Sequence, residues 1–247
     1  MRSTLPIAAA VAALFSLPAG ATPFSGYDMN LVGTANMQGT QLQLINNVGQ
    51  VGAAWMNTQL STANSFNAFF GFSLANTVYN PMADGIAFVM QNGGTSAIGS
   101  GGGDVGYTGL SGVGSVIQTW GNNTAGLNTD GNAYNTKAAP ANLGYAKLVT
   151  GSEMVSYNAS TDTLSMNGIM NVDGNNYFIS DTAHVNLASK FGSTMNVGFT
   201  GGSGLSGADE RITSFNISAV PEPSEYALMA SGLGLFGFIA SRRKKSA

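Results

Sequence analysis

The chain has 247 residues, of which 44% are hydrophobic and only 9% are charged, a balance that excludes global disorder. It contains no cysteine and one histidine, which excludes a disulfide framework, thiol chemistry and a zinc site built from several histidines. The net charge is −3, and most basic residues lie near the two ends, so nucleic-acid binding is not expected.

The first 21 residues have the layout of a secretory signal peptide. Arg2 precedes an apolar run over Ile7–Leu17, and Ala19-Gly20-Ala21 forms an A-x-A cleavage site. Residues 1–21 are therefore predicted to be removed by signal peptidase, and the exported chain is expected to begin near Thr22. Export of a chain without cysteine requires a fold that is stable without disulfides.

Residues 22–219 are predicted to form one all-β domain, with 10 acidic and 4 basic residues. Short segments with period-2 alternation predict strands with one buried face. They include Phe66, Ala68, Phe70, Phe72 and Leu74; Met195, Val197 and Phe199; and Phe215 and Ile217. Gly85–Met90 is a continuous apolar run, typical of a strand buried on both faces. Many short strands with glycine-rich and asparagine-rich turns predict a sandwich or jelly roll.

Residues 220–247 contain Pro221-Glu222-Pro223, an apolar run over 226–240, and Arg242 and Arg243 followed by two lysines. The run predicts a short membrane helix, and the cations are expected to remain cytoplasmic. This arrangement resembles the PEP-CTERM sorting signal of Gram-negative bacteria. The resemblance implies a transient inner-membrane anchor, cleavage by an exosortase, and a final location at the cell surface or in an exopolysaccharide biofilm matrix.

Few residues between the two ends could catalyse a reaction. His184 is the only histidine available for a Ser-His-Asp triad, and it is expected at a strand start or on the surface, so catalysis by it is not expected. Asp209 and Glu210 are adjacent and should point to opposite faces of a strand, which does not suit a glycosidase carboxylate pair. The sequence therefore predicts a protein that is not an enzyme.

Four loops offer groups that suit a shallow sugar site. Asp84 directly precedes the buried run, and residues 101–107 expose glycine N–H groups. Residues 118–122 supply an amide and an aromatic ring, and residues 201–207 form a glycine-rich loop between two strands. A carboxylate and an amide can share sugar hydroxyls, glycine N–H groups can approach closely, and an aromatic ring can cover the apolar sugar face.

The order of these segments resembles the L-type, or legume lectin-like, β-sandwich family. Residues 30–35 resemble the opening strand of that family, and residues 42–44 with 51–55 resemble its second hairpin. Residues 66–74 followed by 83–88 are the most recognisable stretch, and residues 196–201 with 212–215 resemble the closing hairpin. The resemblance implies a legume lectin-like jelly-roll β-sandwich, flanked by the signal peptide and the short transmembrane helix.

The resemblance also implies a carbohydrate site. The residues that it assigns are Asp84 as acceptor for two hydroxyls, Gly103 as backbone donor, Trp120 as stacking ring, Asn122 as amide, and Gly202, Gly204 and Leu205 in the loop that tunes specificity. Gly102 is an alternative to Gly103 because three glycines adjoin.

The metal site departs from the family pattern. Val116, Gln118 and Asn135 stand where the family has a glutamate, an aspartate and a histidine, so the transition-metal site is predicted to be absent. The remaining calcium ligands would be Gln118, Trp120, Asn122 and Asp130. This set contains one charged ligand, which predicts weak calcium binding at best.

Two functions from different classes follow. The first is an exported lectin-like protein that binds a polysaccharide or other glycan without covalent chemistry. The alternative is a structural biofilm-matrix protein that uses a degenerate lectin fold and binds no sugar. A hydrolase ranks third, and loss of polymer viscosity on incubation would be its signature.

Overall fold

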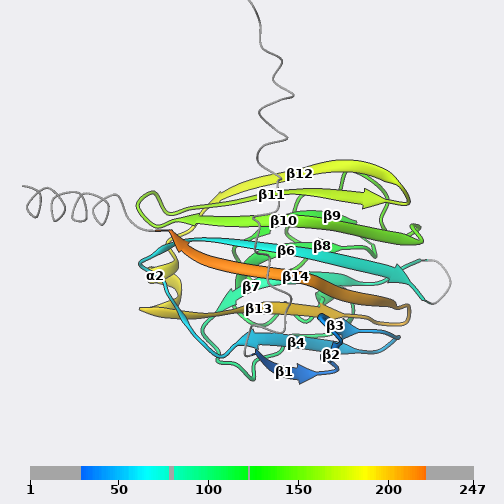
Figure 1. The fold of residues 1–247 in the computed structure, drawn as a ribbon, viewed down its shortest axis with the longest axis horizontal. Coiled ribbons are helices and arrows are strands. Elements are labelled where there is room, and N and C mark those ends of the chain that lie inside the picture. The colour runs from blue at the N-terminus through cyan, green and yellow to red at the C-terminus, as the bar shows by residue number, and fades with distance from the viewer. Residues whose placement is uncertain (1–28, 78–80, 122, 221–247) are drawn as a thin grey trace, which may run out of the picture.

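The computed structural model describes residues 29–77, 81–121 and 123–220. The predicted signal peptide, the sorting signal and Asn122 lie outside these residues. The described part is almost entirely β-structure in two antiparallel sheets (Figure 1). All strands of the described residues lie between residues 29 and 220, and this segment contains its own core.

Sheet A has the strand order β1-β4-β13-β7-β8-β9, with β5 paired to β13. The bounds of these strands are β1 Met29–Gly33, β4 Val51–Met56, β5 Leu60–Ser61, β7 Gly85–Gln91, β8 Val113–Gln118, β9 Thr124–Asn128 and β13 Thr194–Gly202. A short 3-10 helix, η2 (Gly102–Asp104), lies in the long connection between β7 and β8.

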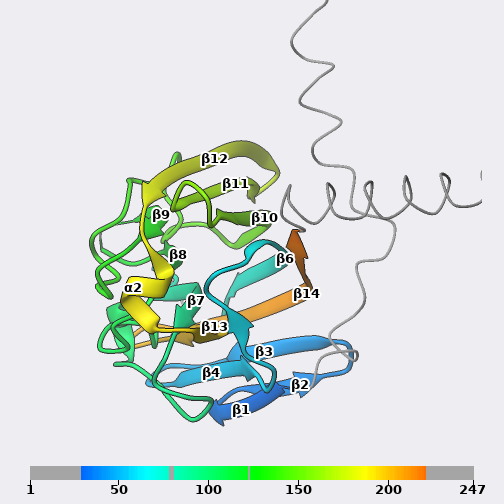
Figure 2. The same cartoon turned by 90° about the vertical axis from the view of Figure 1, so that its left-hand side faces the viewer.

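Sheet B has the strand order β12-β11-β10-β6-β14-β3-β2. Its strands are β2 Asn36–Gln38, β3 Gln41–Ile45, β6 Ser65–Asn76, β10 Leu148–Asn158, β11 Thr163–Val172, β12 Asn175–His184 and β14 Ala208–Val220. The helix α2 (Leu187–Phe191) joins β12 to β13 and is capped at its N-terminus by Asn186, whose side chain accepts the Ser189 N–H. Figure 2 shows the two layers facing each other, with α2 at one end.

The main core fills the space between the sheets. Four phenylalanine rings meet there, Phe70 and Phe215 from sheet B and Phe88 and Phe199 from sheet A. The Phe199 and Phe215 ring centroids are 5.0 Å apart in an edge-on arrangement, which is favourable for aromatic pairs. The predicted alternation of the segment around Phe70 is confirmed, because its five apolar residues are all buried.

A second, smaller core covers the outer face of sheet A. Trp55 and Ala87 pack there against Val105 and Tyr107 of the β7–β8 connection. The continuous apolar sequence of β7 follows from this arrangement, because alternate residues face the two cores. The prediction of a strand buried on both faces is confirmed, and the second core fixes the connection that carries η2.

The prediction of two hairpins, formed by residues 42–44 with 51–55 and by residues 196–201 with 212–215, is wrong. β3 and β4 belong to different sheets, as do β13 and β14, so both connections cross the sandwich instead of turning within one sheet. Alternation could not distinguish these cases, because a strand buries one face in either arrangement. The first crossing requires Gly52, since a Cβ there would lie 2.2 Å from the Leu44 carbonyl oxygen.

Candidate functional site

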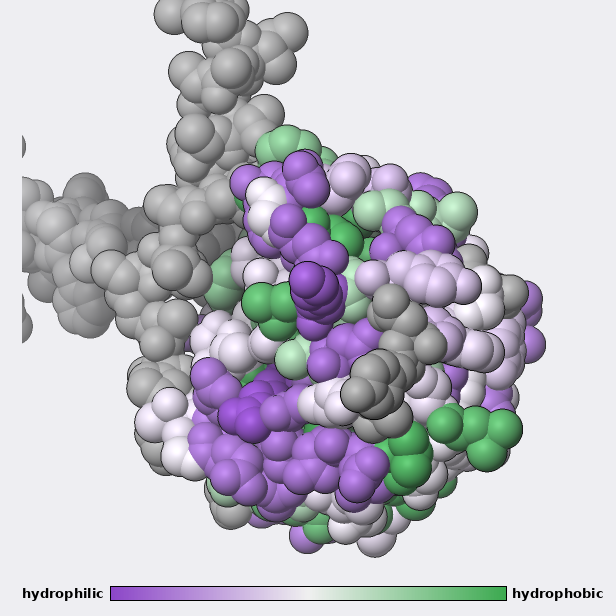
Figure 3. Space-filling model, turned by 90° about the vertical axis from the view of Figure 1, so that its right-hand side faces the viewer, coloured by the Kyte–Doolittle hydropathy of each residue, from purple (hydrophilic) through white to green (hydrophobic). Residues whose placement is uncertain are grey.

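Loops from both sheets meet at one end of the sandwich, on the right in Figure 1. They surround a depression of about 570 Å³, lined by Pro81, Ala83, Asp84, Gly102, Gly103, Trp120, Tyr134, Gly204, Leu205 and Ser206. Five of the seven residues predicted to bind sugar line it. Figure 3 shows that this end is covered mainly by hydrophilic residues, with the hydrophobic ones in small separate groups.

Asp84 lies at the base of the depression and is only 4% exposed. Its N–H donates to the Gly202 carbonyl at 3.0 Å, and its carbonyl accepts the Thr119 N–H at 2.8 Å. Burial raises the pKa of its carboxyl group from 3.8 to about 6, the Gly204 N–H acts against this rise, and the charge of Asp104 adds to it. The carboxyl group is therefore an ionised acceptor at neutral pH.

Gly202 does not line the depression. It is buried at the end of β13, where it pairs with Gly85, and its contribution is the carbonyl oxygen that accepts the Asp84 N–H. It is part of the support for Asp84 and does not face a ligand in this geometry.

Glu210 supports the same segment from sheet B and was missed from the sequence. Its side chain is fully buried, and its Oε1 accepts the Gly85 N–H at 2.8 Å. A Cβ at Gly201 would lie 2.7 Å from Oε2, so a glycine is needed there to admit the carboxyl group. Burial raises its pKa well above the usual value, and the charge of Asp84 adds to the rise. The alternation of Ala208, Glu210 and Ile212 was the available signal, since all three are buried.

The η2 segment forms one wall of the depression. The Gly102 N–H donates to the Ser203 carbonyl at 3.2 Å, whereas no hydrogen bond is found for the Gly103 N–H in the described part of the chain. Of the two glycines considered as donors, Gly103 is therefore the one free to meet a ligand. A Cβ at Gly103 would lie 2.4 Å from the Tyr134 hydroxyl oxygen, so a larger residue there would displace the Tyr134 ring.

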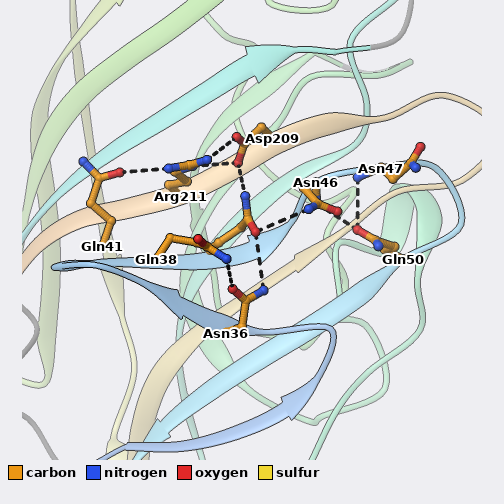
Figure 4. Close-up of polar contacts among 9 residues, drawn as sticks. Asn36, Gln38, Gln41, Asn46, Asn47, Gln50, Asp209 and Arg211 are labelled. Carbon is orange, nitrogen blue, oxygen red and sulfur yellow. Dashed lines mark hydrogen bonds and ion pairs between the residues drawn. The ribbon is translucent and has the colours of Figure 1, made fainter.

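The loop after β13 is fixed at its base and open at its tip. Ser203 exchanges hydrogen bonds with Gln50, and the Gly49 N–H donates to the Gly204 carbonyl at 2.8 Å. Figure 4 shows the Gln50 side chain accepting the N–H groups of two asparagines in the β3–β4 turn. Leu205 is fully exposed. The loop thus presents Leu205 from a rigid base.

Two aromatic side chains stand at the rim. Trp120 is 45% exposed and Tyr134 is 44% exposed, so each offers a ring face while the rest of the side chain is packed. Trp120 was predicted, and Tyr134 was not, because it lies in a turn-rich segment without any periodic pattern. Asn122, the predicted amide, lies outside the described residues.

The described residues among those assigned to calcium do not form a cluster of carboxylates around a cation. Both carboxylate oxygens of Asp130 accept amide N–H groups, from Asn128 at 2.7 Å and from Asn135 at 2.7 Å. The Gln118 side chain donates to the Gly103 carbonyl, which leaves its amide oxygen buried without a partner. Among the described residues, no three His, Asp or Glu side chains come together. Asn135, at the expected histidine position, thus gives the loop an internal partner for Asp130.

This network predicts that the fold is indifferent to divalent cations. A calcium site with a Kd of about 10 µM would raise the free energy of unfolding by about 2.7 kcal/mol at about 1 mM calcium. We expect the melting temperature of residues 22–220 to be the same in calcium and in a chelator, as measured by differential scanning calorimetry. A calcium-dependent rise of several degrees would contradict this expectation.

Comparison with solved structures identifies the architecture. Peanut lectin, solved with a nine-residue peptide, matches at a TM-score of 0.66 and 21% identity, and lectin II from Ulex europaeus matches at 0.66 and 17%. Arcelin-5, a lectin-like defense protein from Phaseolus vulgaris, matches at 0.66 and 19%. Each match covers 78% of this chain and 93% of the other. The fold is that of the legume lectins. At these identities the comparison establishes the lectin fold and does not identify a ligand.

The C-terminal segment matches a separate family model. Residues 219–244 match the PEP-CTERM protein-sorting motif, as their Pro-Glu-Pro, apolar and basic parts predicted. The search of curated proteins found no match to this chain. The membrane helix expected over 226–240 lies outside the described residues, and within them no helix is long and apolar enough to span a membrane.

Proposed function

We propose that the protein is an exported lectin that binds a neutral glycan in the depression around Asp84. The observation that carries this proposal is Asp84 itself, a nearly buried carboxylate that faces a solvent-open depression and is held by backbone contacts from both neighbouring strands. Gly103 supplies a bare N–H group, and Trp120 and Tyr134 supply ring faces. These groups satisfy sugar hydroxyls and cover the apolar face of a sugar ring.

The site favours binding over hydrolysis. A glycosidase needs two carboxyl groups that both reach the scissile bond. Two other carboxyl groups interact electrostatically with the Asp84 site. Glu210 is fully buried and accepts the Gly85 N–H, and Asp104 does not line the depression. Glu210 therefore acts as a support for the Asp84 segment.

The sorting motif supports a location outside the cytoplasm. We propose that signal peptidase removes residues 1–21, that residues 226–240 anchor the chain transiently in the inner membrane, and that an exosortase cuts near Pro221-Glu222-Pro223. The domain would then reach the cell surface or an exopolysaccharide matrix. A polysaccharide in that matrix is the natural class of ligand.

The test is a glycan array probed with residues 22–220, with calcium and with a chelator. The lectin from Bauhinia forficata was solved in complex with GalNAc, so galactose and N-acetylgalactosamine belong in the first set of probes. Binding that survives the chelator is the expected result. Calcium-dependent binding would overturn the metal-free geometry but keep the lectin function.

A non-binding structural role in the matrix is the second candidate. The departure of Gln118 and Asn135 from the metal ligands of the family favours it, because calcium normally orders such a site. Absence of array binding by a folded sample would support this role and contradict the first.

Binding is expected to weaken below pH 6. The pKa of Asp84 is raised to about 6, so the acceptor is protonated at lower pH and its ionised fraction falls about tenfold per pH unit. Burial is the main cause of this raised pKa, and the charge of Asp104 adds to it. Titration calorimetry from pH 5 to pH 8 measures the midpoint. Asp104→Asn should move the midpoint to lower pH, and an unmoved midpoint would contradict the assignment to Asp84.

A further inference from the structure

The surface around Trp120 contains a second depression. It has a volume of about 300 Å³, and Pro81 and Trp120 line it as well as the first. Its other lining residues are Thr119, Gly121, Asn123, Asn142, Gly144 and Tyr145. The two depressions therefore adjoin at Trp120, and both volumes fall in the size range of small-molecule sites.

The loops that carry the two depressions are bonded to each other. The Met82 N–H donates to the Gly144 carbonyl at 2.6 Å, and the Thr119 hydroxyl donates to the Met82 carbonyl at 3.0 Å. The Thr119 N–H in turn donates to the Asp84 carbonyl. A Cβ at Gly144 would lie 2.7 Å from the Thr119 carbonyl oxygen, so the loops approach as closely as a glycine allows. Tyr145 is thus held at a fixed distance from Asp84.

The side chain of Asn123 holds the far part of the second loop. It donates to the Ala141 carbonyl at 2.6 Å and accepts the Leu143 N–H at 2.6 Å. Asn142, between these two residues, is exposed and makes no hydrogen bond within the described residues. Its amide therefore has a donor and an acceptor available to a ligand.

The exposed groups of the second depression suit a sugar ring. Tyr145 is 65% exposed and lies on a loop whose backbone is fixed, so its ring is a preformed apolar face. None of the described residues that line either depression is a lysine or an arginine, whereas Asp84 carries a negative charge at neutral pH. A glycan rich in uronate would be repelled, and a neutral one would not.

We propose that the two depressions are neighbouring subsites for one neutral oligosaccharide chain. Asp84 holds the first sugar, Trp120 lies at the junction, and Tyr145 with Asn142 contacts the next sugar along the chain. This inference rests on the proposed glycan binding and extends it, because it assigns a chain, rather than a single sugar, as the ligand.

The experiment measures the affinity of residues 22–220 for linear gluco-, manno- and galacto-oligosaccharides of one to six units, and for oligogalacturonates of the same lengths. Affinity for the series that binds is expected to rise by about tenfold between one unit and two units, and then to level off. Tyr145→Ala should remove this gain and leave affinity for the single sugar unchanged. Oligogalacturonates should bind at least about tenfold more weakly than neutral chains of equal length.

Phe178→Ala is the matched control, because Phe178 is also 65% exposed but lies on β12, outside both depressions. It should keep the gain with chain length. Affinity that does not depend on chain length, or equal losses for single sugars and chains in Tyr145→Ala, would overturn the second subsite while the lectin function stands. Equal affinity for oligogalacturonates would overturn the neutral class. Absence of binding to every probe would overturn both this inference and the proposed function.

Discussion

Asp84→Asn is expected to abolish glycan binding, with a loss of at least about 100-fold in affinity. The substitution keeps the shape of the side chain but replaces one acceptor oxygen with a donor and removes the charge. Hydrogen bonds to a charged group contribute about 1.5–3 kcal/mol each, so two lost sugar hydroxyl contacts exceed a factor of 100. Titration calorimetry with the best ligand of the array measures the change.

Asp104→Asn is the control for this prediction. Asp104 adds to the negative charge near Asp84 but is absent from the lining of the depression. At pH 8, where Asp84 is ionised in both proteins, this variant should bind within about threefold of the unmodified domain. A thermal melt should show that Asp84→Asn remains folded. Retained affinity in a folded Asp84→Asn protein would place the sugar elsewhere.

Glu153→Gln is expected to stabilise the domain at pH 8 and to have little effect at pH 4. Glu153 lies on the inward face of β10 and is 1% exposed, and neither carboxyl oxygen has a hydrogen-bond partner among the described residues. Burial raises its pKa from 4.5 to about 7. The Ser115 hydroxyl acts against this rise, although the two groups are not within normal hydrogen-bonding geometry.

The direction of this pH dependence follows from the protonation state of Glu153 in the folded and in the unfolded chain. Below pH 4.5 the carboxyl group is protonated in both the folded and the unfolded chain, so ionisation carries no penalty. Between pH 4.5 and about 7 only the unfolded chain releases the proton, so the free energy of unfolding falls as the pH rises. The full penalty is about 3 kcal/mol above pH 7, and Gln, which cannot ionise, should recover it.

Urea unfolding at pH 4, 6 and 8 measures this difference. Asp84 and Glu210 also have raised pKa values, so part of the pH dependence should remain in the variant. Glu153→Met is a second variant that removes the ionisable group at nearly constant volume, and it should also be more stable than the unmodified protein at pH 8. A stability difference that is equal at all three pH values would contradict the assignment.

The strand pattern and several residues of the depression could be predicted from the sequence, because both depend on the order of neighbouring residues along the chain. Period-2 alternation predicts that Phe70 and Phe199 face the core, regardless of which strands pair with theirs. The long apolar run of β7 predicts that both faces of this strand are buried. Asp84 precedes that run, so its place at a strand end and at the sandwich rim followed from the sequence. Gly103, Trp120, Gly204 and Leu205 also line the depression as expected.

These patterns could not predict which strands pair with each other. The two expected hairpins connect different sheets, and only close approaches such as Gly52 to Leu44 show why the chain crosses. Glu210 was dismissed as half of an unsuitable carboxylate pair, yet the sandwich brings it under the Asp84 segment. Its role depends on a contact between residues 125 positions apart.

By itself the sequence determined the all-β class, the segments that form strands, the sorting motif and the place of Asp84 directly before a buried strand. These properties arise from side-chain periodicity and from short contiguous motifs. The tertiary structure alone decided sheet membership, the partners of Asp130, the support from Glu210, and the placing of Trp120 and Tyr145 around one depression. Each of these features depends on residues that are far apart in the sequence. The packing of the two sheets brings these residues together, and no local sequence pattern predicts which of them will meet.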